Sequence, residues 1–558
     1  MHQPTTTVHQ LFCGSLLLCL SMVVTMVHAA QPALNVDPNK INQMFSQYTG
    51  TTPGCAVGLY RSGKLLFARG YGLADLNHWV PIQPNTVFDI GSTSKQFTAL
   101  AIVLLAHDGK LSLKDRVSKH LPELSPAHAP ITLEQMLWHT AGLRDYNELM
   151  LMAGYAEEDP TGEAQALRVI STQAGLNFTP GSRFSYSNSG YFLAALVAER
   201  VSAMGLDAFL QQRVFQPLKM VATHVRTDHT QVVRGRATAY RQLDTGYAIN
   251  MANWNQPGDG AVQSNVQDLA LWDAELANPR VLPAAVVQLL QEPGKLADGH
   301  SLRYALGLEV GHYRGLKRIA HDGAWAGYRA TYMQFAAQQL GLALTCNSAE
   351  ADPNALAERV VDIVLAKHLT EDTKAKSAQT DKALDGSVGY ASGFVGKYLE
   401  TQGSEFFNIT QNSEGNLRWE NAGGVTELRA LTKDMAQTSS GRNQLQRTAQ
   451  GLVLQNREDG QTKTFSRLAP HQADDATAEA LVGHFVSEEL GVQWELKRHK
   501  GLTLQLQSRA MANPVLQSVA PNLWQGPDFI LRVQRDLQGL VSGFVYDSER
   551  VAGLRFKR

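Results

Sequence analysis

The 558-residue sequence has almost no excess of charge of either sign, because 50 Lys and Arg stand against 51 Asp and Glu. A balanced chain without a basic run lacks the electrostatic footprint of a nucleic-acid or anionic-membrane binder. We therefore expect no nucleic-acid partner. The length is too great for a single hydrophobic core, which predicts two to four domains.

Long apolar runs are absent beyond the N-terminus. Residues 11–27 are almost uninterruptedly apolar and lead into the small residues Ala29 and Ala30. Such a run fits a cleaved secretory signal better than a membrane span, although no Lys or Arg precedes it. We therefore predict a signal peptide over residues 1–30 and an exported protein, periplasmic or secreted, with no membrane insertion after cleavage. An uncleaved anchor is the alternative.

Cysteine is scarce, and of four residues only Cys55 and Cys346 lie beyond the predicted signal. An oxidising compartment permits a disulfide, but two thiols so far apart in sequence are equally compatible with two small buried hydrophobes. The 17 His residues include no His-Glu-x-x-His spacing, and no phosphate-binding glycine loop occurs. The sequence therefore implies no metal site and no cofactor.

The first two thirds of the chain differ in pattern from the last third. Residues 31–370 carry strand patterns at both ends and helical periods between them, as in the segment 94–107. This predicts one α/β (α+β) domain of catalytic size. Residues 371–390 are polar and rich in Lys and Ala, which is typical of a linker.

The last third contains an internal repeat. Phe394–Tyr398 (FVGKY) is echoed by Leu481–Phe485 (LVGHF), and each opens a unit of short strands. Two small antiparallel barrels are the natural interpretation, because closure removes exposed strand edges. The predicted barrels cover residues 391–470 and 481–558, with a second linker over 471–480.

A candidate nucleophile lies in Ser92–Lys95 (STSK), at the start of a predicted helix. At a spacing of three, the side chains of Ser92 and Lys95 lie on one helix face. A serine hydroxyl becomes a nucleophile when a neighbouring base removes its proton, and a lysine of lowered pKa can be that base. The pattern is common by chance, and a capped helix with a solvated lysine is the structural alternative.

Two further segments carry groups that fit the same chemistry. Tyr186–Asn188 (YSN) supplies a phenol, which a nearby ammonium biases toward phenolate, and an amide that suits an acyl substrate. His321–Ala324 (HDGA) ends a predicted strand. There the glycine lets a substrate approach the backbone closely, and the Ala324 N–H can join that of Ser92 as an oxyanion hole. Singly, each is equally compatible with an ordinary turn. We predict the catalytic residues Ser92, Lys95 and Tyr186, and the substrate-binding residues Asn188, His321, Asp322, Gly323 and Ala324.

In this order, the three motifs resemble those of class C β-lactamases and penicillin-binding-protein-like serine hydrolases. Residues 133–143 (LEQMLWHTAGL) and 258–261 (GDGA) are also similar to stretches of that family. Within the family, the two barrels and the segments 94–98 (SKQFT) and 142–146 (GLRDY) most resemble the D-aminopeptidases. The resemblance implies a serine β-lactamase-like domain, with an antiparallel sheet flanked by helices, followed by two lipocalin-like barrels.

The resemblance also implies a function. Ser92 would form an acyl-enzyme and Lys95 and Tyr186 would share proton transfer, in a D-stereospecific peptidase or amidase acting on small peptides, amides or esters. A carboxylesterase and a non-catalytic binding protein are the alternatives. In the family fold the first hairpin and the last strand are neighbours, which implies that Cys55 and Cys346 lie close together. The barrels would gate access or mediate homo-oligomer formation.

The chain departs from the family at residues 321–323, where β-lactamases carry Lys-Thr-Gly. The His and Asp found here remove a positive anchor for a substrate carboxylate, and we hypothesise that Asp322 favours neutral or ammonium-bearing substrates. In D-aminopeptidases a loop from the last barrel reaches the active site, but the matching stretch Pro521–Phe529 is short here, which leaves room for a longer peptide, amide or ester. Three aromatic residues either line the cleft or only pack beside it: Trp254, Trp325 and Tyr328.

Overall fold

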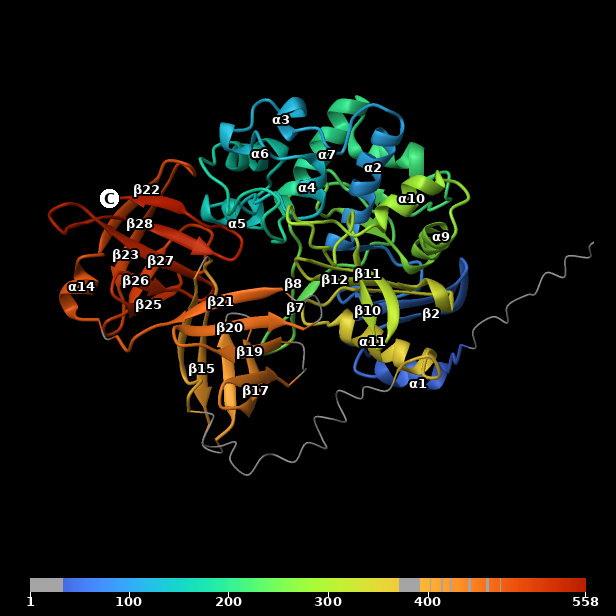
Figure 1. The fold of residues 1–558 in the computed structure, drawn as a ribbon. Coiled ribbons are helices and arrows are strands. Elements are labelled where there is room, and N and C mark those ends of the chain that lie inside the picture. The colour runs from blue at the N-terminus through green and yellow to red at the C-terminus, as the bar shows by residue number, and fades with distance from the viewer. Residues whose placement is uncertain are drawn as a thin grey trace, which may run out of the picture.

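The computed structural model describes residues 34–370 and 392–558, except for 402, 413–414, 422–423, 440–442, 458–460 and 472. The predicted signal peptide, residues 1–30, and the predicted linker, residues 371–390, lie outside the described residues. Figure 1 shows a domain of helices and sheet on one side and two barrels on the other. The predicted fold class, a β-lactamase-like domain followed by two antiparallel barrels, is confirmed.

The first domain is built on a six-stranded antiparallel sheet in the order β10-β11-β12-β13-β1-β2. Strands from both ends of the domain therefore meet at its centre, where β13 pairs with β1. Because the central strands are covered on both faces, they are buried along almost their whole length. The strands are β1 Cys55–Arg61, β2 Lys64–Tyr71, β10 Glu309–Tyr313, β11 Leu316–Trp325, β12 Tyr328–Phe335 and β13 Leu340–Cys346.

Helices cover the two faces of this sheet unequally. One face carries α1 (Pro38–Met44) and α11 (Pro353–Val364). The apolar residues of α11 recur at helical spacing and pack on β12 and β13, and α1 packs against α11. The other face carries α9 (Val266–Ala277) and a helical layer centred on α2 (Lys95–His107) and α7 (Asn188–Ser202). The remaining helices of this layer are α3 Val117–His120, α4 Leu133–Leu137, α5 Tyr146–Met152, α6 Glu163–Ser171, α8 Leu206–Leu210 and α10 Ala284–Leu290.

Short strands support the loops around the helical layer. A three-stranded sheet joins β5 (Phe88–Asp89), β9 (Val262–Ser264) and β6 (His224–Val225). Two-stranded sheets are formed by β3 (Leu73–Asp75) with β4 (Val80–Pro81), and by β7 (Tyr240–Gln242) with β8 (Tyr247–Ile249). The 3-10 helix η1 (Gly91–Ser94) runs directly from β5 into α2 and contacts β11.

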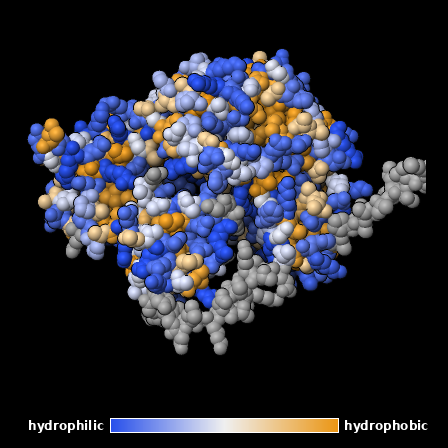
Figure 2. Space-filling model, in the orientation of Figure 1, coloured by the Kyte–Doolittle hydropathy of each residue, from blue (hydrophilic) through white to orange (hydrophobic). Residues whose placement is uncertain are grey.

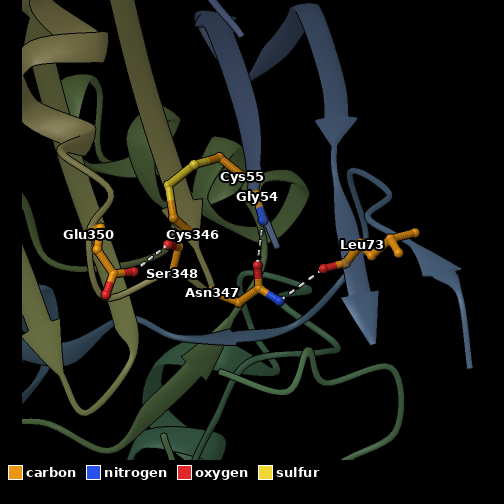
Figure 3. Close-up of a disulfide and its surroundings, with 7 residues drawn as sticks. All are labelled: Gly54, Cys55, Leu73, Cys346, Asn347, Ser348 and Glu350. Atoms are coloured by element: carbon orange, nitrogen blue, oxygen red, sulfur yellow. Dashed lines mark hydrogen bonds between the residues drawn. A yellow bond between two sulfur atoms is a disulfide. The ribbon is translucent and has the colours of Figure 1, made fainter. Parts of the chain in front are cut away.

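A disulfide joins Cys55 to Cys346, as Figure 3 shows. The two residues are direct partners in the β1–β13 register, so the proximity that the family resemblance implies is confirmed. The next residue, Asn347, ties the same region together: its Nδ2 donates to the Leu73 carbonyl (3.0 Å) and its Oδ1 accepts from the Gly54 N–H (2.8 Å). The covalent link thus closes the central seam of the sheet.

Both C-terminal units are closed eight-stranded barrels. The first has its own apolar core, which includes Phe394, Phe407 and Trp419. Its strands are β14 Gly396–Glu400, β15 Phe406–Gln411, β16 Leu417–Asn421, β17 Gly424–Thr432, β18 Met435–Thr438, β19 Asn443–Arg447, β20 Gly451–Asn456 and β21 Thr462–Arg467.

The second barrel is joined to the first domain by a continuous core. Trp494 and Phe556, for example, belong to the same cluster of buried residues as helices α2 and α7. A short helix, α14 (Asp475–Glu479), precedes it. Its strands are β22 Gly483–Ser487, β23 Val492–Arg498, β24 Leu504–Gln507, β25 Val515–Ala520, β26 Leu523–Gln525, β27 Phe529–Arg535, β28 Val541–Ser548 and β29 Leu554–Lys557.

Exposed large hydrophobic residues are spread over both parts of the molecule, for example Trp79 in the first domain and Leu537 in the second barrel. On the face that Figure 2 shows, hydrophilic residues predominate and hydrophobic ones gather in separate patches. Within the described ranges, no helix combines the length and the apolar character needed to cross a membrane.

Candidate active site

Ser92 and Lys95 lie at the junction between η1 and α2, at the centre of the domain. The Lys95 ammonium is fully buried and donates to the Ser92 hydroxyl (Nζ–Oγ 3.0 Å). It also donates to the Asn188 side-chain oxygen (2.8 Å) and to the Asp259 carbonyl (2.7 Å). Three acceptors therefore fix the lysine beside the serine, as the spacing of three predicts.

The buried position changes the proton affinity of Lys95. Burial lowers the pKa of its side chain to about 8, against the opposing effect of the Asp259 and Asp145 carboxylates. Desolvation disfavours the charged form of any ammonium, and here this effect is the largest. A neutral amine is therefore accessible near neutral pH, which is the form that can remove a proton from Ser92.

Tyr186 lies beside Lys95 and Ser92. The Lys95 ammonium lies 5.0 Å from the centre of the Tyr186 ring. Burial nevertheless raises the pKa of this phenol well above its usual value, and the neighbouring Ser92 hydroxyl opposes the rise only in part. The phenolate expected from the neighbouring ammonium is not favoured, because desolvation outweighs it. Tyr186 is thus a proton donor in the free protein.

His139 holds the Tyr186 segment in place. The Ser187 N–H donates to His139 Nδ1 (3.1 Å), and the Ser185 N–H donates to the His139 carbonyl (2.9 Å). The imidazole also packs on the phenol ring, with 4.1 Å between ring centres. Burial lowers the pKa of His139 well below its usual value, so the ring stays neutral and can accept. The sequence contained His139 within a family-like stretch but gave no signal of this role.

Glycines let β11 approach the nucleophile segment. A Cβ on Gly323 would lie 2.0 Å from the Ile90 carbonyl oxygen and 3.1 Å from the Ser92 nitrogen. A Cβ on Gly91, whose φ is +52°, would lie 2.7 Å from the Ala324 nitrogen. The Ser92 and Ala324 backbones are thus side by side, as an oxyanion hole requires. The close approach that Gly323 permits is therefore between two protein segments, β11 and η1, rather than between the backbone and a substrate.

His321 and Asp322 project to different sides of β11, as successive strand residues do. His321 is buried, with its Nε2 against the Tyr304 hydroxyl (2.8 Å) and its Nδ1 against the Asp322 carbonyl (2.6 Å). Burial lowers its pKa to about 4, so it supplies no positive charge at neutral pH. The Asp322 carboxylate instead accepts from Asn354 (3.3 Å) at the start of α11, on the opposite face of the sheet.

A pocket opens to solvent beside Ser92. Ser92, Asn188 and Ala324 line it, whereas Tyr186, His321 and Asp322 do not. The predicted contact of Asp322 with substrate therefore has no support from this pocket. Of the three aromatic candidates, two line the pocket, Trp254 and Trp325, and the third, Tyr328, is buried and donates to a backbone carbonyl.

Two buried carboxylates support the site from α5 and its surroundings. Asp145 accepts from the backbone N–H of Asn188 (2.7 Å) and so fixes the start of α7. Asp259 accepts from the Tyr146 hydroxyl (2.9 Å), and burial raises the pKa of its carboxyl to about 6. Both lie in stretches that the family resemblance included, but their side chains were not predicted to act here.

The second barrel also reaches the site, through the loop between β28 and β29. The Arg550 guanidinium lies 5.6 Å from the centre of the Tyr186 ring and 4.0 Å from the Asp145 carboxylate. The Arg550 carbonyl accepts the Asp145 N–H (3.0 Å), and Ser548 donates to Glu148 (2.6 Å). The family resemblance pointed to a different loop of this barrel, Pro521–Phe529. The β28–β29 loop could not be predicted, because its residues carry no catalytic spacing.

Curated proteins with similar sequences include several D-aminopeptidases. Identity is 27% to that of Gluconobacter oxydans, over 54% of this chain and 56% of that protein, so the match spans little more than half of the relative. Identity to a D-aminopeptidase of Cereibacter sphaeroides is 25%, over 85% of this chain and 87% of that protein. Identity to penicillin-binding protein 4* of Bacillus subtilis is 25%, over 66% of this chain and 82% of that protein.

Solved structures share the fold at low identity. The octameric penicillin-binding protein homologue from Pyrococcus abyssi matches 77% of this chain and all of its own, with 20% identity and a TM-score of 0.55. A D-amino acid amidase from Ochrobactrum anthropi SV3 matches 59% of this chain and 99% of its own, with 20% identity and a TM-score of 0.51. The Beta-lactamase family model matches residues 41–366, which is more than half of the chain. The protein therefore belongs to the β-lactamase family and is a serine hydrolase of that fold.

Proposed function

We propose that the protein is an exported D-stereospecific peptidase or amidase of the D-aminopeptidase type, acting through an acyl-enzyme on Ser92. The observation that carries the proposal is the contact between the buried Lys95 ammonium and the Ser92 hydroxyl, at 3.0 Å. Several of the similar curated proteins are D-aminopeptidases, which supports the proposed substrate class. A carboxylesterase remains the alternative, since the same site would cleave an ester.

Acylation begins with proton transfer. Neutral Lys95 takes the proton of Ser92, whose oxygen attacks the carbonyl carbon of the substrate. The negative charge that develops on the carbonyl oxygen is stabilised by the N–H groups of Ser92 and Ala324. The tetrahedral intermediate collapses as the bond to the leaving amine breaks, and that nitrogen takes a proton from Tyr186, which Lys95 then restores. Water hydrolyses the acyl-enzyme by the same steps in reverse.

The two parts of the substrate would occupy different sides of Ser92. The leaving amine must lie beside Tyr186 to receive its proton, and Tyr186 does not line the pocket. The pocket then holds the acyl part, with the Asn188 amide along it. Arg550 of the second barrel lies on the leaving-group side, over the Tyr186 ring. This arrangement gives the second barrel a part in selecting the leaving group.

The rate should depend on pH through Lys95. Because burial lowers the pKa of Lys95 to about 8, the base is protonated and inactive below that pH and neutral above it. We expect kcat/KM to rise about tenfold per pH unit from about pH 6 and to level off above about pH 9. Steady-state rates with a p-nitrophenyl ester, together with thermal unfolding at each pH, provide the measurement. A rate that is flat or falls with pH over this range would rule out Lys95 as the base.

The substrate class can be tested with matched pairs. Amino-acid p-nitroanilides of D and L configuration should differ in kcat/KM by at least about tenfold in favour of D, and Ser92→Ala should cleave neither. Turnover of p-nitrophenyl esters without any turnover of anilides would identify a carboxylesterase. The absence of both, in a folded protein that no serine probe modifies, would identify a binding protein.

We also propose export, which rests on the apolar run at residues 11–27 and on the Cys55–Cys346 disulfide. Structural disulfides persist in oxidising compartments and are rare in the cytosol. The protein isolated from the periplasm or the medium of an expressing bacterium should have the mass of a chain that begins at Gln31. Full-length protein confined to the cytosol would contradict the proposal. Homo-oligomer formation through the barrels stays a prediction.

A further inference from the structure

Arg226 brings a cation into the pocket beside the nucleophile. It follows β6, and its backbone N–H donates to the Ala261 carbonyl (2.9 Å), next to the segment whose Asp259 carbonyl binds Lys95. Arg226 lines the same pocket as Ser92, yet only 5% of its surface is exposed. The sequence alone predicts no role for Arg226.

Among the described residues, the Arg226 guanidinium has no hydrogen-bonding partner. Its Nε is buried without a hydrogen bond, and none of its side-chain nitrogens has a hydrogen bond or an ion pair within the described part of the chain. Burial lowers the pKa of Arg226, and the nearby Asp89 carboxylate opposes this effect. The two Asp89 oxygens, however, already accept hydrogen bonds from the Gly91 N–H (2.8 Å) and from Gln263 Nε2 (2.7 Å). A buried charge whose donors are unused is costly, and an anionic ligand would relieve that cost.

Two buried acceptors in the same pocket are also unused. Asn147 Oδ1 and Gln256 Oε1 have no hydrogen-bond partner among the described residues, and both residues line the pocket. The orientation of the Gln256 amide follows from its Nε2, which donates to the Gly162 carbonyl (3.0 Å) and to Thr161 (2.9 Å). The pocket therefore offers the hydrogen-bond donors of the Arg226 guanidinium and, separately, the acceptor oxygens of Asn147 and Gln256.

We infer that this pocket binds the acidic N-terminal residue of a peptide or amide, with the side-chain carboxylate on Arg226 and the ammonium on Asn147 and Gln256. The planar fork of an arginine matches the two oxygens of a carboxylate, and the amide oxygens accept from an ammonium. The inference rests on the proposed function, in which the acyl part of the substrate occupies the pocket. It names the acyl residue as an acidic amino acid.

Asp322 does not oppose this assignment. Its carboxylate lies against Asn354 on the other face of the sheet, outside the pocket. In this proposal, recognition of both charges of an acidic amino acid takes the place of the preference for neutral or ammonium-bearing substrates that was predicted from Asp322. Two observations support this substitution of one substrate class for the other. The Asp322 side chain points away from the pocket, and Arg226, which is distant from Asp322 in sequence, lines it.

Binding to the Ser92→Ala protein tests the inference without requiring turnover. The probes are D-isoglutamine, which carries a side-chain carboxylate, and D-glutamine α-amide, which carries a carboxamide of the same shape. Calorimetric titration should give at least about tenfold tighter binding of D-isoglutamine. In Arg226→Gln this preference should fall below about twofold, whereas Arg226→Lys, which keeps the charge, should retain part of it.

A control separates this effect from a general one. Arg234 is exposed, so Arg234→Gln should leave the preference unchanged. Equal affinities for the two amides, no binding of either, or a preference that survives Arg226→Gln would overturn the inference. Modification of wild-type Ser92 by a serine probe reports on the proposed function alone, and so distinguishes a wrong substrate class from a protein that is not a hydrolase.

Discussion

Replacement of Lys95 by methionine is expected to lower kcat/KM by about a thousandfold or more. General-base and nucleophile activation each contribute factors of this size, and the structure gives Ser92 no other amine within hydrogen-bond distance among the described residues. Methionine keeps the length and most of the volume of the lysine stem but removes the proton acceptor. Steady-state rates with a p-nitrophenyl ester and with the preferred anilide measure the loss.

The folded state of this variant needs a separate check. The change removes three hydrogen bonds and also removes the cost of burying a charge, so we expect the free energy of unfolding to change by no more than about 2 kcal/mol. Lys110, which is exposed at the end of the same helical region, provides the matched control, and Lys110→Met should retain full activity. A loss of less than tenfold in folded Lys95→Met would contradict the role of Lys95.

Substitution of Gly323 by alanine is expected to damage both stability and activity. The added methyl group would lie 2.0 Å from the Ile90 carbonyl oxygen, which belongs to the backbone and cannot rotate away. β11 must therefore move away from η1. We expect the free energy of unfolding to fall by about 3 kcal/mol. Loss of the Ala324 N–H from the oxyanion hole should lower kcat by about a hundredfold or more.

Gly311 in β10 supplies the control for this substitution. There the added methyl group would meet only the end of the Arg303 side chain, at 2.7 Å, and such an end can shift. Gly311→Ala should therefore retain activity and most of its stability. Thermal unfolding and steady-state rates on both variants give the comparison. Full activity in Gly323→Ala would contradict the close contact between β11 and η1.

Much of the fold was readable from the sequence because its signals are local. The apolar run of α2, the repeated FVGKY and LVGHF openings and the alternating strands near residues 55–71 each specify an element without its neighbours. Ser92 and Lys95 were found for the same reason, since three residues on one helix decide their contact. The order of the motifs then identified the family that arranges these elements in space.

The rest of the site depends on contacts between distant segments. The proposed role of Arg226 depends on a pocket that other loops form, and on the lack of a hydrogen-bonding partner for its side chain among the described residues. The position of Arg550 beside Tyr186 and Asp145 depends on the docking of the second barrel, which is distant from both in the sequence. The Tyr186 phenol was misjudged because its burial is a tertiary property. The direction of Asp322 was predictable in principle, since neighbours in a strand face opposite sides of the sheet.

The central claim is that Ser92 is an activated nucleophile, and modification by a fluorophosphonate tests it most directly. Intact-mass measurement of the mature protein should show a single adduct, none in Ser92→Ala and slow formation in Lys95→Met. A smaller phosphonyl fluoride, used beside the first probe, excludes blocked access. If folded wild-type protein gains no adduct with either reagent, or if Ser92→Ala is modified equally, the protein is not the serine hydrolase described here.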